Sequence, residues 1–243
     1  MKVLMIIPAY NEEKSILNTV TSIENTKLKN HTLDYIVIND GSKDNTKEVC
    51  KKNNINFIDL SVNLGIGGAV QTGYKYALYN NYDIAIQFDG DGQHDAAYIE
   101  SLVNEIINGN DIVIGSRFVS NLSEFKSTAM RRVGVNVLSK LIKICTKKRI
   151  YDPTSGFRAG NKKIIEEFAN EYPADFPEPD TIVSIIKKGY KVSEIPVKMN
   201  ERKEGKSSLN SNIFKPAYYM IKVCIAIIIA SISTKKVGGK NAK

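Results

Sequence analysis

The sequence predicts an α/β protein with a mostly parallel sheet and helices on both faces. Four apolar runs, with a shorter fifth, have the length and composition of buried strands: residues 3–7, 35–39, 84–88, 111–115 and 57–60. Segments with helical periodicity alternate with them: residues 12–24, 43–52, 67–79 and 96–107. In such folds ligands bind at the carboxyl ends of the strands, where the polar motifs of this chain fall.

The first two strands each lead into a polar loop. The run at residues 3–7 has only five apolar residues before Pro8 and then becomes acidic, so we expect a strand rather than a signal peptide or a span. "PAYNEE" follows it, and "NDGSKDNT" follows the second strand. In the second loop Asp40 lies at the strand tip, Gly41 permits a tight turn, and Ser42 or Asp44 can cap the next helix. Taken alone, these loops fit simple capped connections.

"NLGIGGAVQTG", residues 63–73, opens the third helix. A helix amino terminus favours an anion, because its backbone N–H groups are unpaired and its dipole is positive there. The segment lacks the Gly-Lys-Ser/Thr of a Walker loop, and Val70 stands where the dinucleotide fingerprint has its last glycine. On its own it is a weak indication of phosphate binding.

"FDGDGQHD" gives the strongest chemical indication. Asp89 and Asp91 are one residue apart at the tip of a central strand, and two carboxylates so close favour a cation between them. Oxygen ligands suit Mg²⁺ or Mn²⁺, with water and substrate phosphates in the remaining positions. The alternative from these residues alone is a solvated turn with two surface acids. An EF-hand is excluded, since its further ligands and terminal Glu are absent.

The pattern changes after Arg117. Residues 129–147 form an amphipathic helix, with Asn136 and Lys140 on one face and Val133, Val137 and Ile144 on another. We interpret "YDPTSGFRAG" as a turn and residues 190–199 as a late strand. Residues 217–233 are apolar except for Lys222, which is marginal for a membrane span of about 20 residues. We expect the basic tail, residues 234–243, to be disordered.

The charge of this chain is segregated. Its net charge is +8, yet residues 125–151 hold eight basic and no acidic residues, and residues 205–243 hold seven lysines and no acid. Both segments are also rich in large apolar residues, which favours an anionic membrane surface over nucleic acid. The three cysteines lie far apart, so neither a disulfide framework nor a zinc site is predicted, and we expect a reduced, cytosolic compartment.

Together these motifs resemble the family 2 glycosyltransferases, near the dolichyl-phosphate mannose synthase and bacterial polyprenyl-phosphate branch. The resemblance rests on "PAYNEE", "NDGSKDNT", "NLGIGGAVQTGYKYA", "FDGDGQH", "GSR", "DPTSGFRA" and "GYKVSEIPVKMNERKEGKSSL", in that order over residues 1–209. It implies a GT-A catalytic domain over that range, a nucleotide-diphosphate sugar donor and inversion at the anomeric carbon. Residues 213–233 then form a membrane-associated helix outside this domain.

The resemblance also implies roles for particular residues. The nucleotide-sugar site would be formed by Pro8, Ala9, Tyr10, Glu12, Asp40, Gly68, Asp89, Gly90 and Asp91. Asp89 and Asp91 would hold Mg²⁺ or Mn²⁺ against the diphosphate, assisted by Gln93. Arg202 and Lys206 would neutralise the departing nucleoside diphosphate; the residues alone equally fit a solvated basic loop.

The acceptor is the least determined part of this interpretation. The resemblance implies a polyprenyl phosphate, met by Arg117 and Arg131 beside an interfacial helix at residues 129–147. A lipid phosphate is already ionised near neutral pH and needs no strong base. A glycan or glycolipid hydroxyl is the alternative, and Asp152, Glu178 and Asp180 are then the candidate bases, although Asp180 also fits a helix cap.

Other functions are less compatible with the sequence. "IPAYNEE" lacks the glycine-rich loop of a sugar nucleotidyltransferase, and the intact Asp-x-Asp disfavours a non-catalytic scaffold. We therefore expect a UDP-sugar, or alternatively GDP-mannose, to be used at the cytoplasmic face of the membrane. The terminal apolar segment could lie in the interface, span it, pair with a small membrane partner or form a homo-oligomer.

Overall fold

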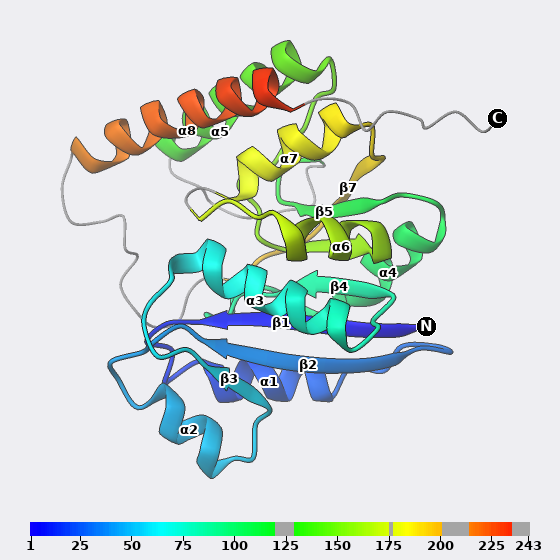
Figure 1. Cartoon of the computed structure of the whole chain (residues 1–243), viewed down its shortest axis with the longest axis vertical. Coiled ribbons are helices and arrows are strands. Elements are labelled where there is room, and N and C mark those ends of the chain that lie inside the picture. Colours follow the sequence, from blue (N-terminus) through cyan, green and yellow to red (C-terminus); the bar gives the residue numbers. More distant parts are fainter. Residues whose placement is uncertain (120–128, 175–176, 201–213, 235–243) are drawn as a thin grey trace.

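The computed structural model describes residues 1–119, 129–174, 177–200 and 214–234, with only the backbone for residues 129–131, 214–217 and 219. A seven-stranded sheet runs through the middle of the described structure (Figure 1), in the order β3-β2-β1-β4-β6-β5-β7. Its strands are β1 (Lys2–Ala9), β2 (Thr32–Asn39), β3 (Phe57–Asp59), β4 (Ile84–Gln87), β5 (Ile112–Ser116), β6 (Arg158–Asn161) and β7 (Val192–Pro196). The mostly parallel α/β fold is confirmed.

The alternation of side chains along β1 separates two cores. Val3, Met5 and Ile7 face one side, whereas Leu4 and Ile6 face the other, as the pleat of a strand requires. All five are completely buried, so this central strand is covered on both faces. The first face packs against α1 (Ile16–Glu24), α2 (Thr46–Lys52) and α4 (Ile99–Ile107), which a short 3₁₀ turn (Ala96–Tyr98) precedes.

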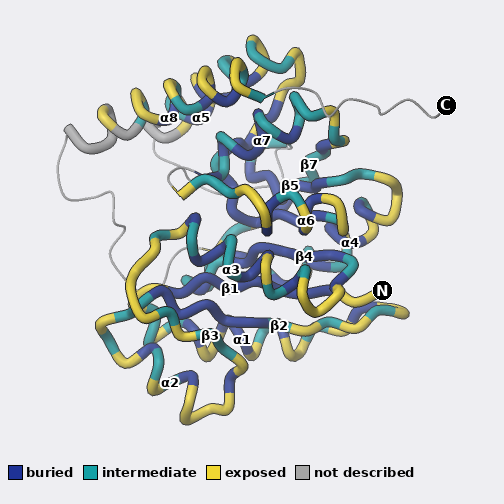
Figure 2. The backbone as a smooth tube through the Cα atoms, in the orientation of Figure 1, coloured by how far each residue is buried: buried dark blue, intermediate teal, exposed yellow. Residues whose placement is uncertain are grey.

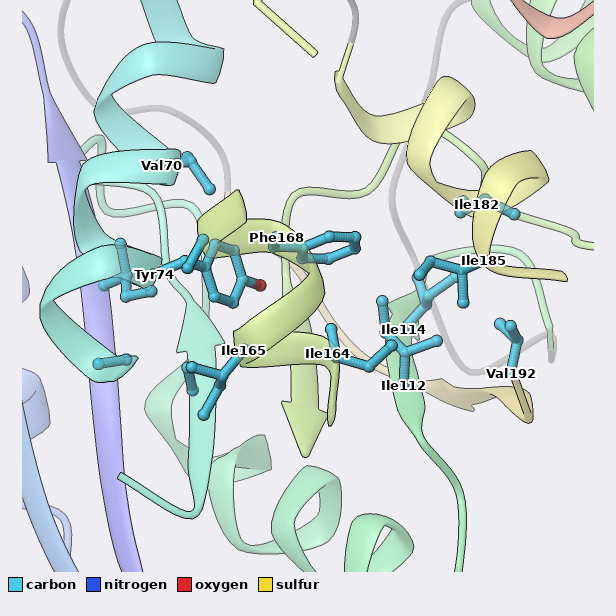
Figure 3. Close-up of a cluster of buried hydrophobic side chains, with 14 of the residues drawn as sticks. Val70, Tyr74, Ile112, Ile114, Ile164, Ile165, Phe168, Ile182, Ile185 and Val192 are labelled. Carbon is cyan, nitrogen blue, oxygen red and sulfur yellow. The ribbon is translucent and has the colours of Figure 1, made fainter. Parts of the chain in front are cut away.

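The second face is covered by α3 (Gly65–Tyr79), α6 (Lys162–Asn170) and α7 (Pro177–Lys188). Figure 3 shows Tyr74 of α3 beside Phe168 of α6, and their rings meet edge to face with centroids 5.1 Å apart. Ile164, Ile182 and Ile185 continue the same cluster over β5. These contacts hold the late helices against the early half of the sheet, and so fix the loops between them.

β6 and the helix after it correct the sequence interpretation. The segment predicted to be a turn ends in β6, which pairs antiparallel with both β4 and β5 and is the exception in an otherwise parallel sheet. Gln87 of β4 pairs with Arg158 of β6, and Ile114 of β5 pairs with the same residue. Asn161 then caps α6 by accepting from two backbone N–H groups. A strand from the second half of the chain, β6, therefore lies between β4 and β5 in the sheet.

Two further helices, α5 (Ala129–Thr146) and α8 (Phe214–Ser233), lie side by side on the outer side of α7 (Figure 1). Val135, Leu138 and Ile142 of α5 are buried, whereas Val133, Val137 and Ile144, the apolar face expected from the sequence, are exposed beside the lysines. Among the described residues, no helix combines the length and the apolar character needed to cross a membrane.

Candidate functional site

Polar residues gather at the carboxyl ends of β1, β2 and β4, which parallel pairing brings to one edge of the sheet. The loops after β1 and β2 are joined directly. Asn11 donates its backbone N–H to Ser42 Oγ at 2.9 Å, and Lys43 donates its N–H to Asn11 Oδ1 at 2.8 Å. Glu13 accepts from the Asn45 N–H at 3.0 Å. This bonding gives the first two predicted motifs one shared framework.

Within this framework, the residues predicted to bind the nucleoside differ in exposure. Pro8 and Ala9 end β1 in the core, whereas Tyr10 is 43% exposed. Glu12 donates its backbone N–H to Thr46 Oγ1 at 2.9 Å. The Tyr10 ring is therefore an accessible aromatic surface on this loop.

Asp40 connects β2 to the start of α3. Its side chain is almost completely buried, and its Oδ1 accepts the Leu64 N–H at 2.7 Å. Burial raises the pKa of Asp40 above its ordinary value, although the N–H groups of Leu64 and Gly65 oppose that rise. Gly68 lies in the first turn of α3. The strand tip and the helix amino terminus thus form one corner of the site.

The acidic turn, residues 89–93, follows β4. The Asp89 side chain is 36% exposed and is approached by two side chains, Gln87 Nε2 at 3.3 Å from Oδ1 and His94 Nε2 at 3.1 Å from Oδ2. Burial raises the pKa of Asp89, but His94, Gln87 and the charge of Arg117 outweigh this effect and hold the pKa below its ordinary value. The carboxylate is therefore ionised and accessible near neutral pH.

The rest of the acidic turn is fixed by backbone contacts. Gly90 donates to Pro8 O at 3.3 Å, which attaches the turn to the end of β1. Asp91 Oδ1 accepts the Gln93 N–H at 3.0 Å, and the Gln93 carbonyl accepts the Asn200 N–H at 2.8 Å. The described chain thus returns to this turn just before residue 201.

The acidic turn fits a divalent cation that is bound together with a ligand. The described residues contain no cluster of three or more His, Cys, Asp or Glu side chains able to enclose a metal. Two carboxylates, from Asp89 and Asp91, with the amide oxygen of Gln93 nearby in sequence, provide the hard oxygen donors that Mg²⁺ and Mn²⁺ prefer. Such a set leaves positions for water and phosphate oxygens.

The loop before β6 comes very close to Asp89. A Cβ atom added at Gly156 would lie 2.9 Å from Asp89 Oδ2 and 2.8 Å from Gln87 Nε2. Only glycine allows this approach of the backbone to the carboxylate. The "DPTSG" segment is therefore part of the same site, although it lies more than 60 residues from Asp89 in the chain.

Asp152 and Arg117 form an enclosed ion pair. Asp152 Oδ2 accepts from Arg117 Nε at 2.7 Å and Oδ1 accepts from Arg117 Nη2 at 2.8 Å, with both side chains at most 5% exposed. The Asp152 N–H also donates to Glu194 at 2.9 Å. The ion pair gives Asp152 a structural role in this loop, and it places the Arg117 guanidinium against the Asp152 carboxylate.

Glu178 is a candidate base that interacts with residues of β4 and the acidic turn. It lies in the first turn of α7, where its carboxylate interacts with Gln87 and, electrostatically, with the charges of Arg158 and Asp89. Burial raises the pKa of Glu178, while Arg158 and Gln87 oppose the rise. Burial also raises the pKa of Asp180, with a smaller contribution from Glu171. Glu178 thus interacts electrostatically with Asp89.

Arg158 joins the two segments that flank Glu178. Its guanidinium is completely buried and donates to Ser155 O at 2.7 Å, Pro153 O at 3.2 Å and Thr181 Oγ1 at 2.9 Å. The "DPTSG" loop and the first turn of α7 are thereby held together. Arg202 and Lys206 lie outside the described residues, as does the side chain of Arg131.

The sequence interpretation assigned no role to three residues of this site: Gln87, His94 and Arg158. Each of them lies in one of the motifs quoted above or next to one. The neighbouring sequence alone, however, indicates only a strand or a turn at each position. The useful signal was a polar residue within an apolar run, as Gln87 is in "IAIQF", since a buried polar side chain needs a partner. That partner could not be named before the position of β6 was known.

Comparisons with known proteins agree with this geometry. The family model described as glycosyl transferase family 2 matches residues 5–169. A UDP-N-acetylglucosamine–dolichyl-phosphate N-acetylglucosaminyltransferase of Methanococcus voltae is 36% identical over 217 residues, covering 81% of this chain and 84% of the relative. A polyprenol monophosphomannose synthase of Mycolicibacterium smegmatis is 25% identical, covering 90% and 85%.

A solved structure shares the fold. Glucosyl-3-phosphoglycerate synthase from Mycobacterium tuberculosis, crystallised with Mn²⁺, uridine diphosphate and phosphoglyceric acid, superposes with a TM-score of 0.69 at 15% identity, covering 98% of this chain and 80% of that one. The family match spans more than half of the chain and includes the acidic turn and the "DPTSG" loop. The chain therefore belongs to glycosyl transferase family 2 and is a GT-A glycosyltransferase.

Proposed function

We propose that this enzyme transfers a sugar from a nucleotide-diphosphate sugar, preferentially a UDP-sugar, to a polyprenyl phosphate at the cytoplasmic face of a membrane. The observation that carries the proposal is the acidic turn at the edge of the sheet, with the "DPTSG" loop against Asp89; the helices α5 and α8 pack on the outside of α7. The names of the two relatives above, both of which act on lipid-linked phosphates, support the acceptor class.

The donor would lie across the ends of β1, β2 and β4. Tyr10 offers an exposed ring for the base, and the Asp40 corner faces the same region. One oxygen of Asp40 already accepts a backbone N–H. The carboxylate is then suited to a base that presents one N–H, as uracil does, better than to guanine, which presents two adjacent donors to a carboxylate. This reasoning favours UDP as the leaving group.

The diphosphate would lie over the acidic turn, and we propose that Gly68 and Gly90 are near it. Asp89 and Asp91 are the residues that would hold Mg²⁺ or Mn²⁺, and Gln93 would assist. The ion supplies Lewis-acid neutralisation of the charge on the departing diphosphate. We propose that Arg202 and Lys206 add cationic charge to the same leaving group; the segment that contains them continues from Asn200, beside Gln93.

The reaction is a displacement at the anomeric carbon. An oxygen of the acceptor phosphate forms the new bond to C1 while the bond from C1 to the diphosphate oxygen breaks, which inverts the configuration. The acceptor oxygen is already ionised near neutral pH, because the second pKa of a phosphate monoester is about 6. No residue therefore has to remove a proton from the acceptor. We propose that Arg131 provides a positive charge that binds the acceptor phosphate.

A hydroxyl acceptor is the second candidate, and one observation favours it. Glu178 is a partly buried carboxyl whose pKa is raised by burial and that interacts with Gln87 and with the charge of Asp89, which is an environment suited to a general base. With a hydroxyl acceptor, Glu178 would take the proton as the bond to C1 forms. The two candidates make opposite predictions for a Glu178 variant.

The membrane contact would be made by the outer faces of α5 and α8. α8 exposes Tyr218, Ile221, Ile225, Ile228, Ile229 and Ile232, which recur at helical spacing on the face opposite to buried Val223 and Ile227. α5 adds Val133, Val137 and Ile144 among Lys140 and Lys143. An apolar face bordered by basic residues suits the surface of an anionic bilayer.

The proposed activity is tested by the release of nucleotide diphosphate from UDP-sugars and GDP-sugars, with Mn²⁺ and with or without added polyprenyl phosphate. We expect release from a UDP-sugar that rises when the lipid phosphate is added. Release that is unaffected by the lipid but increased by a glycan would move the acceptor to a hydroxyl. The absence of release with every donor and acceptor would contradict catalysis by this site.

A further inference from the structure

His94 is an unusual buried residue next to the acidic turn. Its side chain is 3% exposed, and neither ring nitrogen has a hydrogen-bond partner among the described residues. Nε2 lies 3.1 Å from Asp89 Oδ2, but without the geometry of a hydrogen bond. A buried polar atom without a partner costs about 1–3 kcal/mol. A histidine at this position therefore requires an explanation that packing alone does not give.

Aromatic rings hold this imidazole in one orientation. The ring of Phe157 stacks on it with centroids 4.9 Å apart at 28°, and the ring of Phe88 meets it at 5.3 Å and 64°. The backbone of His94 also bridges to Met199. Phe88 and Phe157 are completely buried, so the imidazole has little freedom to turn. Its Nε2 stays directed toward the Asp89 carboxylate.

The two oxygens of Asp89 are approached from two sides. Gln87 Nε2 donates to Oδ1 at 3.3 Å, and the His94 ring faces Oδ2. Carboxylates that bind metals are commonly oriented by polar side chains around them, and loss of such a partner typically lowers metal affinity by about 10–100-fold. We infer that His94 is a positioning residue, which holds Asp89 in the orientation that receives the divalent cation. The inference rests on the metal site of the proposed function.

The chain offers a matched set of variants. His94→Phe keeps an aromatic ring between Phe88 and Phe157 but removes both nitrogens. His94→Gln keeps a side-chain N–H donor near the position of Nε2. His31→Phe is the control, because His31 is the other histidine of the chain and lies at the start of β2, at the opposite end of the sheet from the site.

Mn²⁺ binding in the presence of UDP, followed by electron paramagnetic resonance, is the first measurement. We expect His94→Phe to raise the Kd for Mn²⁺ by about tenfold or more, with His94→Gln recovering most of the affinity and His31→Phe unchanged. Equal affinity in wild type and a folded His94→Phe protein would overturn the inference alone. Equal weakening by Phe and Gln would overturn it too, since it would indicate packing.

The second measurement uses the wild-type protein, so that it stands even if a variant does not fold. With only two histidines, ¹⁵N-histidine labelling gives two sets of ring signals. Addition of Mg²⁺ and UDP should shift the ring signals of His94 and leave those of His31 in place. Binding of Mg²⁺ and UDP without any change at His94 would overturn the inference, and absence of Mn²⁺ binding by the wild-type protein would overturn the metal site with it.

Discussion

Among the individual residues, the two carboxylates of the acidic turn, Asp89 and Asp91, have different surroundings. Asp89 is oriented by side chains, from Gln87 and His94, whereas Asp91 Oδ1 accepts the backbone N–H of Gln93. An amide oxygen can replace a carboxylate oxygen as the acceptor of one N–H, but it carries no charge. The shape of the turn and its affinity for a cation are therefore separable at position 91.

The first prediction follows from this separation. Asp91→Asn should keep the turn, because the Asn oxygen can still accept the Gln93 N–H, and should lose Mn²⁺-dependent binding of the donor. Isothermal titration of a UDP-sugar with and without Mn²⁺ measures the effect, with thermal unfolding as the control. Undiminished Mn²⁺-dependent binding by a folded Asp91→Asn protein would contradict the metal assignment.

The second prediction concerns Glu178. If the acceptor is a phosphate, Glu178→Gln should lower kcat by less than about tenfold, because general base catalysis, worth about 10²–10⁴-fold, is not needed. The amide can still interact with Gln87, so the local contacts are largely kept. Single-turnover rates with polyprenyl phosphate measure this effect. A loss of a thousandfold or more would identify Glu178 as the base and favour a hydroxyl acceptor.

At the scale of the element, the "DPTSG" loop and β6 complete a site that the early strands begin. The loop brings Gly156 against Asp89, the Arg117–Asp152 pair anchors it on one side, and Arg158 joins it to α7 on the other. The Arg158 guanidinium has no carboxylate within ion-pair distance among the described residues, which is a costly arrangement for a buried cation. The connection that Arg158 makes between the "DPTSG" loop and α7 therefore depends on hydrogen bonds and not on an ion pair.

The third prediction tests the loop. Gly156→Ala should weaken Mn²⁺ and donor binding together, because its Cβ would lie 2.9 Å from Asp89 Oδ2 and must displace the carboxylate. Gly109→Ala is the comparison: Gly109 has φ +98° and nothing near the added Cβ, so it should lower stability without affecting the site. Thermal unfolding and Mn²⁺ titration of both variants separate the two effects. Normal Mn²⁺ affinity in Gly156→Ala would contradict the close approach.

β1 and β4 could be predicted because each contains a continuous apolar run that is buried on both faces. β6 could not, since "RAGN" contains an arginine and a glycine and is a strand only because β4 and β5 pair with it. The residues of the acidic turn were predicted from spacing and resemblance. Gln87, His94 and Arg158 were not given roles, because their partners come from strand order and not from any local pattern.

At the scale of the whole molecule, α5 and α8 add a second apolar layer outside the catalytic fold. Figure 2 shows these helices with buried positions toward α7 and exposed positions on the outside. The exposed isoleucines of α8 form a contiguous apolar surface, which soluble proteins seldom leave in contact with water. The proposed membrane contact therefore involves this surface and not the sheet.

The fourth prediction tests that surface. Ile225→Gln combined with Ile229→Gln should lower binding to vesicles of anionic phospholipid without lowering stability, because both side chains are more than half exposed. Ile107→Gln, at the end of α4 on another part of the surface, is the matched control. Vesicle sedimentation measures binding. Unchanged sedimentation of the double variant would contradict membrane contact through α8.

Transfer of a sugar to a polyprenyl phosphate can be measured with a radiolabelled transfer assay. Purified protein, Mn²⁺ and polyprenyl phosphate would be incubated with labelled UDP-sugars and GDP-sugars in turn, and the products extracted into organic solvent. We expect label in the organic phase with a UDP-sugar donor and none with the Asp91→Asn protein. Nucleotide release with all labelled product in the aqueous phase would contradict this expectation and move the acceptor to a hydroxyl.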